Sequence, residues 1–262
     1  MKHILKQIFY LVAISALTAL TQEPLSVRKL RESGDTLDIS IIQELDHASY
    51  NGTAWLKSRQ NEDGSFGDND TLKCTALSIL VLSGDQSKEN AEISSKAVKW
   101  LTLELKNKAT TNIEVAAWCC AAIAVGLTDD KISIPQCATM EFLIQNSPET
   151  KGNATQLCNE ILLSIAPNAD TLKLKRKMVN ETNYYYNKIS LDEMWLNARS
   201  INNSEGQLLN KSGKRIDWRG KYAEKLIGTQ KIDSKGGGYW EGSTVDKNVY
   251  NTALAIIISK EL

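Results

Sequence analysis

The chain has 262 residues, of which 42% are hydrophobic, and this is enough for one domain with a sizeable core. Its 31 basic side chains balance 31 acidic ones, so no charge excess predicts nucleic acid or an acidic membrane surface as a partner. The five cysteines are few for this length and odd in number, which argues against a dense disulfide framework.

The N-terminus has the layout of a secretory signal peptide, predicted over residues 1–21. Lys2 and Lys6 precede an apolar run from Ile8 to Leu20. A retained membrane anchor is the alternative, but the run is short for a span of about 20 residues. We therefore expect a periplasmic or secreted chain with no integral membrane segment after cleavage. Residues 22–40 are polar and predict a flexible arm before a domain at 41–262.

Amphipathic helices alternate with almost wholly apolar ones along this domain. The amphipathic helices are predicted near residues 41–58, 91–106, 134–145, 170–179 and 218–229, and the apolar ones near 71–83, 113–125, 154–165, from 182, and 249–259. A helix that is apolar all round must be buried, which indicates inner helices wrapped by outer ones. The polar segment 201–213 predicts an inserted loop, and no strand is predicted.

A similar turn follows the first and the last amphipathic helix. The eight residues that define it are Gln60, Asp63, Gly64, Phe66, Gln230, Gly237, Gly238 and Trp240. Glycine permits the backbone to leave a helix sharply, and glutamine can reach backbone groups of neighbouring helices. These residues therefore predict a structural turn between an outer and an inner helix. The outer helices recur with a period of about 40 residues, which is typical of a helical repeat array.

These repeats predict an all-α fold, a small or incomplete α/α toroid of about five helix pairs. The pattern W-L-x3-Q-x2-D-G-S-F-G at 55–67, followed by T-A-L-x-I-L, resembles the repeats of the squalene-cyclase and protein-prenyltransferase superfamily, whose fold is this toroid. The C-terminal third resembles a bacterial secreted group within it, through Tyr184-Tyr185, Trp218, Gln230, the turn 237–240 and the segment 249–254.

The catalytic sets that this resemblance would imply are missing from the sequence. It has no D-x-D-D cluster, no Gly-Cys-Gly-Glu-Gln thioester motif, and only His3 and His47 as candidate imidazole ligands for zinc. We therefore expect no cofactor and no catalytic residues. The favoured function is an exported, non-catalytic binding or scaffold module for a protein or polymer partner.

An enzyme is the alternative, acting on an isoprenoid or other apolar substrate in an aromatic-lined central cavity. The candidate lining residues are Tyr184, Tyr185, Trp195, Trp118, Tyr250 and Glu160. A carboxylate such as Glu160 or Asp192 would be the acid. Tyrosine on a buried helix equally fits an ordinary core position.

Three cysteines, Cys74, Cys119 and Cys158, occupy the same place in three consecutive apolar helices. This placement fits a thiolate metal site or a disulfide. It also fits a column of small residues that lets the helices pack closely, which is the interpretation we favour, with no metal.

Overall fold

The computed structural model describes residues 37–84, 87–107, 112–126, 189–203, 208, 210 and 212–262. These residues are mostly helical, with one two-stranded sheet, so the all-α prediction is confirmed. The chain divides into two compact units. We call Arg59–Lys175 with Met1–Gln22 the middle unit, and Glu23–Ser58 with Arg176–Leu262 the end unit.

In the middle unit, two apolar helices pack on each other and on an amphipathic one. Helix α4 (Thr71–Leu82) packs against α6 (Ile113–Gly126) and against α5 (Lys88–Asn107). Every residue of α4 from Cys74 to Leu82 is buried. Helix α5 instead alternates a buried stripe with an exposed face, as its sequence predicts.

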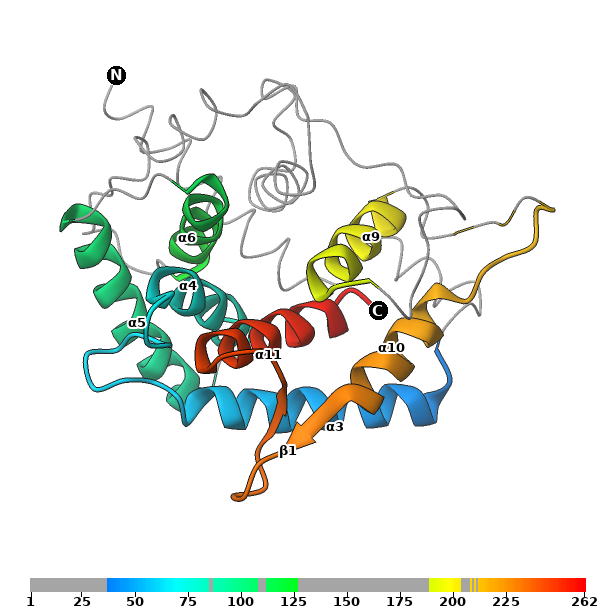
Figure 1. Cartoon of the computed structure of the whole chain (residues 1–262), viewed down its shortest axis with the longest axis horizontal. Helices are drawn as coiled ribbons and strands as arrows, with labels where there is room; N and C mark the ends of the chain where they lie inside the picture. The colour runs from blue at the N-terminus through cyan, green and yellow to red at the C-terminus, as the bar shows by residue number, and fades with distance from the viewer. Residues whose placement is uncertain are drawn as a thin grey trace. The chain divides into compact units, whose positions relative to one another are not determined.

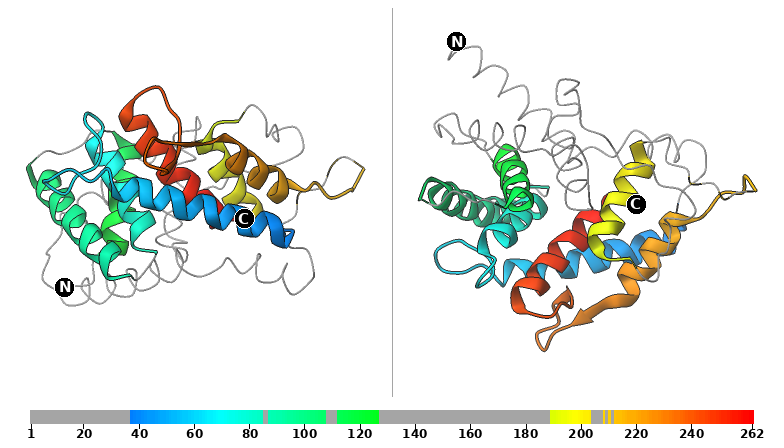
Figure 2. Two further views of the ribbon diagram at one scale, coloured as in Figure 1. Left: turned by 90° about the horizontal axis from the view of Figure 1, so that it is seen from below. Right: turned by 45° about the horizontal axis from the view of Figure 1, so that its top comes forward.

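The end unit brings the first described helix together with the last ones (Figures 1 and 2). It contains α3 (Ile39–Lys57), α9 (Leu191–Asn203), α10 (Trp218–Thr229), β1 (Gln230–Ile232), β2 (Gly238–Trp240) and α11 (Val245–Ser259). Helix α11 packs along α3, with α9 and β2 also against it, and α10 packs on α3 as well. The core of this unit is therefore built from segments at opposite ends of the chain.

Two local predictions are wrong. A hairpin follows α10, with β1 antiparallel to β2 and Gln230 opposite Trp240, where no strand was predicted. Strands of three residues are too short to show an alternating pattern. Helix α9 also continues to Asn203, into the predicted loop. Ile201 and Asn202 are buried there, so tertiary contacts override the low helix propensity of that polar stretch.

Side-chain caps explain where other helices begin. Asp38 accepts a hydrogen bond from the amide of Ser40, so α3 starts inside the predicted flexible arm. Thr244 accepts one from the amide of Lys247, so α11 starts earlier than predicted. Helix α10 spans Trp218–Thr229 as predicted, after the cap Asp217.

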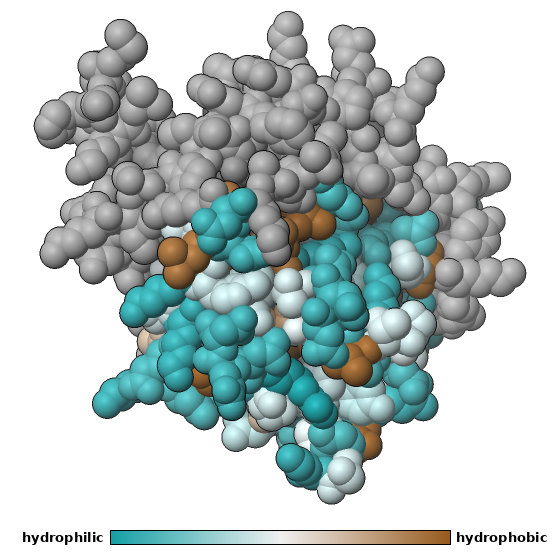
Figure 3. All heavy atoms as spheres, turned by 60° about the vertical axis from the view of Figure 1, so that its left-hand side comes forward, coloured by the Kyte–Doolittle hydropathy of each residue, from teal (hydrophilic) through white to brown (hydrophobic). Residues whose placement is uncertain are grey.

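The described residues on the face seen in Figure 3 are mostly hydrophilic, with apolar side chains scattered between polar ones. Large apolar side chains that are exposed in the described residues are Ile39, Tyr50, Leu103, Ile232 and Val245. Among the described helices, none combines the length and the hydropathy that crossing a membrane requires.

Candidate functional site: two helix junctions and a polar pair

The first repeat turn docks on helix α5 within the middle unit. The amide nitrogen Nε2 of Gln60 donates to the carbonyl of Gly64 at 3.1 Å and to that of Ile93, on α5, at 2.9 Å. Gln60 also pairs with Phe66 in an antiparallel bridge. The backbone N–H of Phe66 donates to Oγ1 of Thr75, on α4, at 2.9 Å. One turn thus connects the amphipathic helix α5 and the apolar helix α4.

Asp63 and Gly64 shape this turn. Oδ1 of Asp63 accepts from the hydroxyl of Ser65 at 2.7 Å and from its backbone N–H at 2.9 Å. These two hydrogen bonds favour the ionised form and lower the pKa of Asp63, and the indole of Trp100 on α5 adds to this effect. Gly64 has a φ of 97°, and a Cβ there would lie 2.8 Å from the carbonyl oxygen of Lys96. Only glycine fits both the backbone angle and the close approach.

The second repeat turn docks on helix α3 within the end unit. Nε2 of Gln230 donates to the carbonyl of Ala48, on α3, at 2.7 Å. The backbone N–H of Trp240 donates to Oγ1 of Thr252, on α11, at 3.1 Å. The indole of Trp240 is buried and donates to the carbonyl of Leu226 at 2.8 Å.

Aspartate and glycine recur in the second turn. Oδ1 of Asp233 accepts from the backbone N–H groups of Lys235 and Gly237, each at 2.9 Å. A Cβ on Gly237 would lie 3.0 Å from the side chain of Trp55. The ring of Trp55 also stacks on Tyr239, with centroids 5.2 Å apart. Glycine at this position therefore lets the turn lie against α3.

The two turns contact equivalent positions of the helices on which they dock. Ile93 stands as far before Leu101 in α5 as Ala48 stands before Leu56 in α3. Each turn also has a glycine two residues before its aromatic side chain, Phe66 or Trp240, and these two glycines likewise lie against equivalent positions of α5 and α3. Gly64 faces Lys96 of α5. A Cβ added to Gly238 would lie 3.0 Å from the Cβ of Asn51 in α3. The turn after α3 thus docks on α5 in the way that the turn after α10 docks on α3.

Two of the predicted site residues are in contact at the start of α9 and α11. The hydroxyl of Tyr250 donates to Oδ1 of Asp192, in the first turn of α9. The ammonium of Lys247 lies 4.1 Å from the centroid of the Tyr250 ring. The carboxylate of Asp192 is partly exposed, whereas Tyr250 is buried. We call this contact the Asp192–Tyr250 pair, in which the phenol fixes the position of the carboxylate.

The remaining candidate lining residues are distributed over the chain. Trp195 is buried in the end unit, and Trp118 is buried in the middle unit. Tyr184, Tyr185 and Glu160 lie outside the described residues. Their predicted place at a central cavity stays a prediction.

The middle unit has an ion pair that the sequence did not suggest. Nζ of Lys73 lies 2.5 Å from Oε1 of Glu114, and both side chains are mostly buried. Lys73 precedes Thr75 in α4 as Tyr250 precedes Thr252 in α11. Each contacts an acidic side chain in the first turn of an adjacent helix. The repeated Thr-Ala-Leu triplet was the signal that could have revealed this position.

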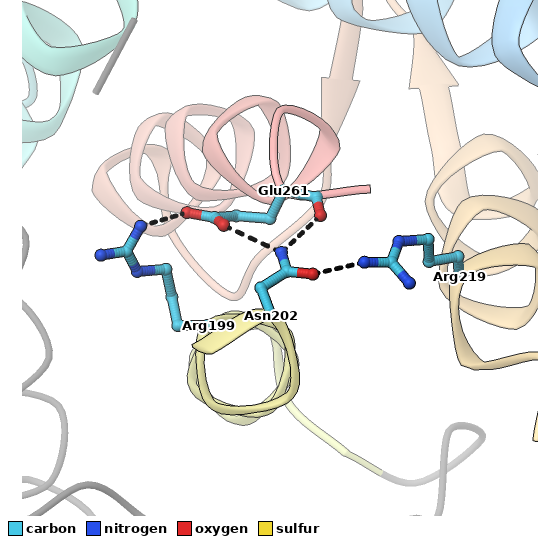
Figure 4. A network of polar contacts seen from close by, with 4 residues as sticks. All are labelled: Arg199, Asn202, Arg219 and Glu261. Carbon is cyan, nitrogen blue, oxygen red and sulfur yellow. Dashed lines mark hydrogen bonds and ion pairs between the residues drawn. The ribbon is translucent and has the colours of Figure 1, made fainter. Parts of the chain in front are cut away.

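A polar network joins α9, α10 and Glu261, which follows α11 (Figure 4). Nη1 of Arg199 donates to Oε1 of Glu261 at 3.0 Å. Nδ2 of Asn202 donates to the backbone carbonyl of Glu261 at 2.8 Å and to its Oε2 at 3.2 Å. Arg219 donates to Oδ1 of Asn202 and covers the ring of Trp218 at 4.2 Å. Asn202 is 17 residues from Arg219 and 59 from Glu261, so no local pattern relates these partners and sequence reasoning missed them.

Cys74 and Cys119 are buried, and neither forms a disulfide. The thiol of Cys119 lies 3.9 Å from the carbonyl oxygen of Leu72. Cys158 lies outside the described residues. Within the described ranges, no three His, Cys, Asp or Glu side chains gather in a way that could hold a metal ion.

The comparisons with known proteins do not identify a family. No protein-family model, curated protein or solved structure matches this chain.

Proposed function

We propose that this chain is an exported binding or scaffold module built on a small α/α toroid of the squalene-cyclase and prenyltransferase type. The observation that carries the proposal is the pair of matching helix junctions. Gln60 and Gln230 each donate to a backbone carbonyl at the same position of an outer helix. In a linear array the last outer helix would have no next neighbour, whereas here the turn after α10 docks on α3.

A ring of this kind presents its ends and its inner wall to a partner, because its repeats use their other faces to bind one another. The sequence lacks the D-x-D-D and thioester motifs of related enzymes, which favours binding over catalysis. The basic and apolar N-terminus favours export, to the periplasm or beyond the cell. The partner that fits best is a protein or polymer in that compartment.

A capture experiment with a matched control tests this proposal. The mature chain is immobilised and exposed to periplasmic extract or culture medium, and bound proteins, polymers and small molecules are identified by mass spectrometry. The control is Gly52→Leu, which would force the α3 contact apart because a Cβ at Gly52 lies 2.9 Å from Trp240. We expect one partner on the wild type that the control loses. Equal retention by both forms would contradict a role for the closed ring.

The second candidate is an enzyme in which Asp192 acts as the acid. The hydrogen bond from Tyr250 supports it, because it fixes the position of the Asp192 side chain at the start of α9. Copurifying small molecules are incubated with the protein, and their conversion is followed by mass spectrometry. We expect conversion to be lost in Asp192→Asn but kept in Glu224→Gln, which changes a side chain that is 55% exposed. Conversion that survives Asp192→Asn would eliminate this candidate.

A further inference from the structure

Helix α3 occupies a groove formed by α10, β2 and α11, and we call this contact the seam. The buried residues of α3 are Leu45, Ala48, Gly52, Trp55 and Leu56. A Cβ on Gly52 would lie 2.9 Å from Trp240 and 3.1 Å from Ile256, so the helix backbone lies close against the groove. The seam resembles a helix bound in an apolar groove, a common mode of peptide recognition.

Polar contacts fix the register of α3 in this groove. Nε2 of Gln230 donates to the carbonyl of Ala48 at 2.7 Å, and Oγ of Ser49 donates to Oγ of Ser259 at 2.8 Å. The partners in these bonds are 182 and 210 residues apart in the chain. By contrast, the matching bond from Gln60 to Ile93 spans 33 residues.

We propose that the groove also accepts α3 from a second copy of this chain, so that two copies exchange this helix. Every contact of the seam can be made identically between two chains, because none of them depends on which chain supplies α3. The hinge is the short link from Ser58 to Gln60, after which the chain is held on α5 by the bond to Ile93. This inference concerns assembly and does not depend on any ligand of the proposed ring.

Folding order favours exchange at high protein concentration. The loop that the seam closes is long, and the entropic cost of closure grows with loop length. The groove is formed by α10, β2 and α11, so α3 can dock only after these later segments of the chain have folded. At that stage the groove of another chain competes with the groove of its own, which is a known route to exchanged dimers in repeat proteins.

Paired cysteine variants distinguish the two arrangements. Ser49→Cys with Ser259→Cys places two thiols across the seam, at positions whose hydroxyl oxygens are 2.8 Å apart. The matched control is Ser83→Cys with Ser94→Cys, whose hydroxyl oxygens are 3.1 Å apart within the middle unit. Each full-length variant is refolded at low and at high protein concentration, oxidised, and separated on a denaturing gel without reductant.

We expect the seam variant to yield a covalent dimer whose share rises with refolding concentration, and the control to stay monomeric at both concentrations. Light scattering of the refolded wild type provides a second measurement that needs no disulfide, and it should show a dimer after refolding at high concentration. A seam disulfide that stays within one chain at every concentration would overturn the proposal. A wild type that is monomeric throughout would overturn it as well.

Discussion

At the scale of single residues, two threonines hold the turns onto helices α4 and α11. Thr75 and Thr252 are fully buried, and each hydroxyl accepts the backbone N–H of the turn aromatic, Phe66 or Trp240. A buried amide that loses its acceptor cannot be satisfied by water. These hydroxyl groups are therefore part of the fold, although threonine in an apolar helix looks like a simple packing residue.

Replacing Thr252 by Val keeps the shape of the side chain and removes the acceptor. We expect Thr252→Val to lower the free energy of unfolding by about 1–3 kcal/mol, because the N–H of Trp240 is left unsatisfied. Urea unfolding followed by circular dichroism measures this change. Thr229→Val is the control, because Thr229 is exposed and its hydroxyl donates to the carbonyls of Lys225 and Leu226 in its own helix. Equal losses of unfolding free energy in both variants would show that accepting the N–H of Trp240 does not make the Thr252 hydroxyl stabilising.

Tyr222 makes stability depend on alkaline pH. Burial raises the pKa of its phenol from 10.0 to about 12, while a hydrogen bond from Asn197 partly opposes this rise. A pKa that is higher in the folded state stabilises the fold below the unfolded value and loses this contribution as pH rises from 10 to about 12.

We expect Tyr222→Phe to flatten this part of the stability profile. As pH rises from 10 to about 12, the wild type should lose unfolding free energy relative to Tyr222→Phe. Urea unfolding at a series of pH values measures this difference. Tyr50→Phe serves as the control, since its ring is exposed and its loss should leave the wild-type slope unchanged. An unchanged slope in Tyr222→Phe would contradict the assignment.

At the scale of elements, the repeat turn depends on glycine where another helix approaches. Gly64 and Gly213 both have positive φ angles, of 97° and 75°. Only Gly64 has a neighbour in the way of a side chain, the carbonyl oxygen of Lys96 at 2.8 Å, whereas nothing lies within 4 Å of a Cβ at Gly213. The two positions therefore separate backbone strain from steric conflict.

Alanine at each position measures the two effects. We expect Gly213→Ala to cost about 1–2 kcal/mol through the left-handed backbone alone. Gly64→Ala should cost about 1–3 kcal/mol more, because the turn must move away from α5. Thermal and urea unfolding of both variants gives the comparison. Similar losses would mean that the turn has room to adjust, so that its docking on α5 is loose.

At the scale of the whole molecule, the end unit depends on how closely α3 approaches α11. Gly52 lies in the middle of α3, where a glycine normally weakens a helix. Its missing side chain lets Trp240 and Ile256 pack on the helix backbone. Gly52 therefore lowers the intrinsic stability of α3 but allows the close packing of Trp240 and Ile256 on this helix.

Leucine at position 52 should open the seam. We expect Gly52→Leu to lower the free energy of unfolding by about 1–3 kcal/mol or more through overpacking, and to speed protease cleavage near α3. Ala54→Leu adds the same side chain on the exposed face of the same helix and should change stability by less than about 0.5 kcal/mol. Limited proteolysis read by mass spectrometry checks both variants. If Gly52→Leu were as resistant as Ala54→Leu, the seam would not limit access to α3.

Hydrophobic periodicity by itself predicted that α4, α5, α6 and α10 are helices. The stripe on α5, the wholly apolar α4 and α6, and the bounds of α10 all follow from residues that are neighbours in sequence. The repeated Gln, Asp, Gly and aromatic residues likewise predicted two similar turns. Only the tertiary structure decided which helix each turn contacts, because the bond from Gln230 to Ala48 joins segments that no local pattern relates.

Some polar groups could be singled out in the sequence and others could not, but in both cases only the tertiary structure decided their partners. Asp192 and Tyr250 stood out in the sequence as an acid and an aromatic on inner helices, but their mutual hydrogen bond required the packing of α9 on α11. The network of Arg199, Asn202 and Glu261 gave no sequence signal, since its charges meet only after the last residues fold back. Periodicity acts over a few residues, whereas partners are chosen by burial and by hydrogen-bond satisfaction across the whole core.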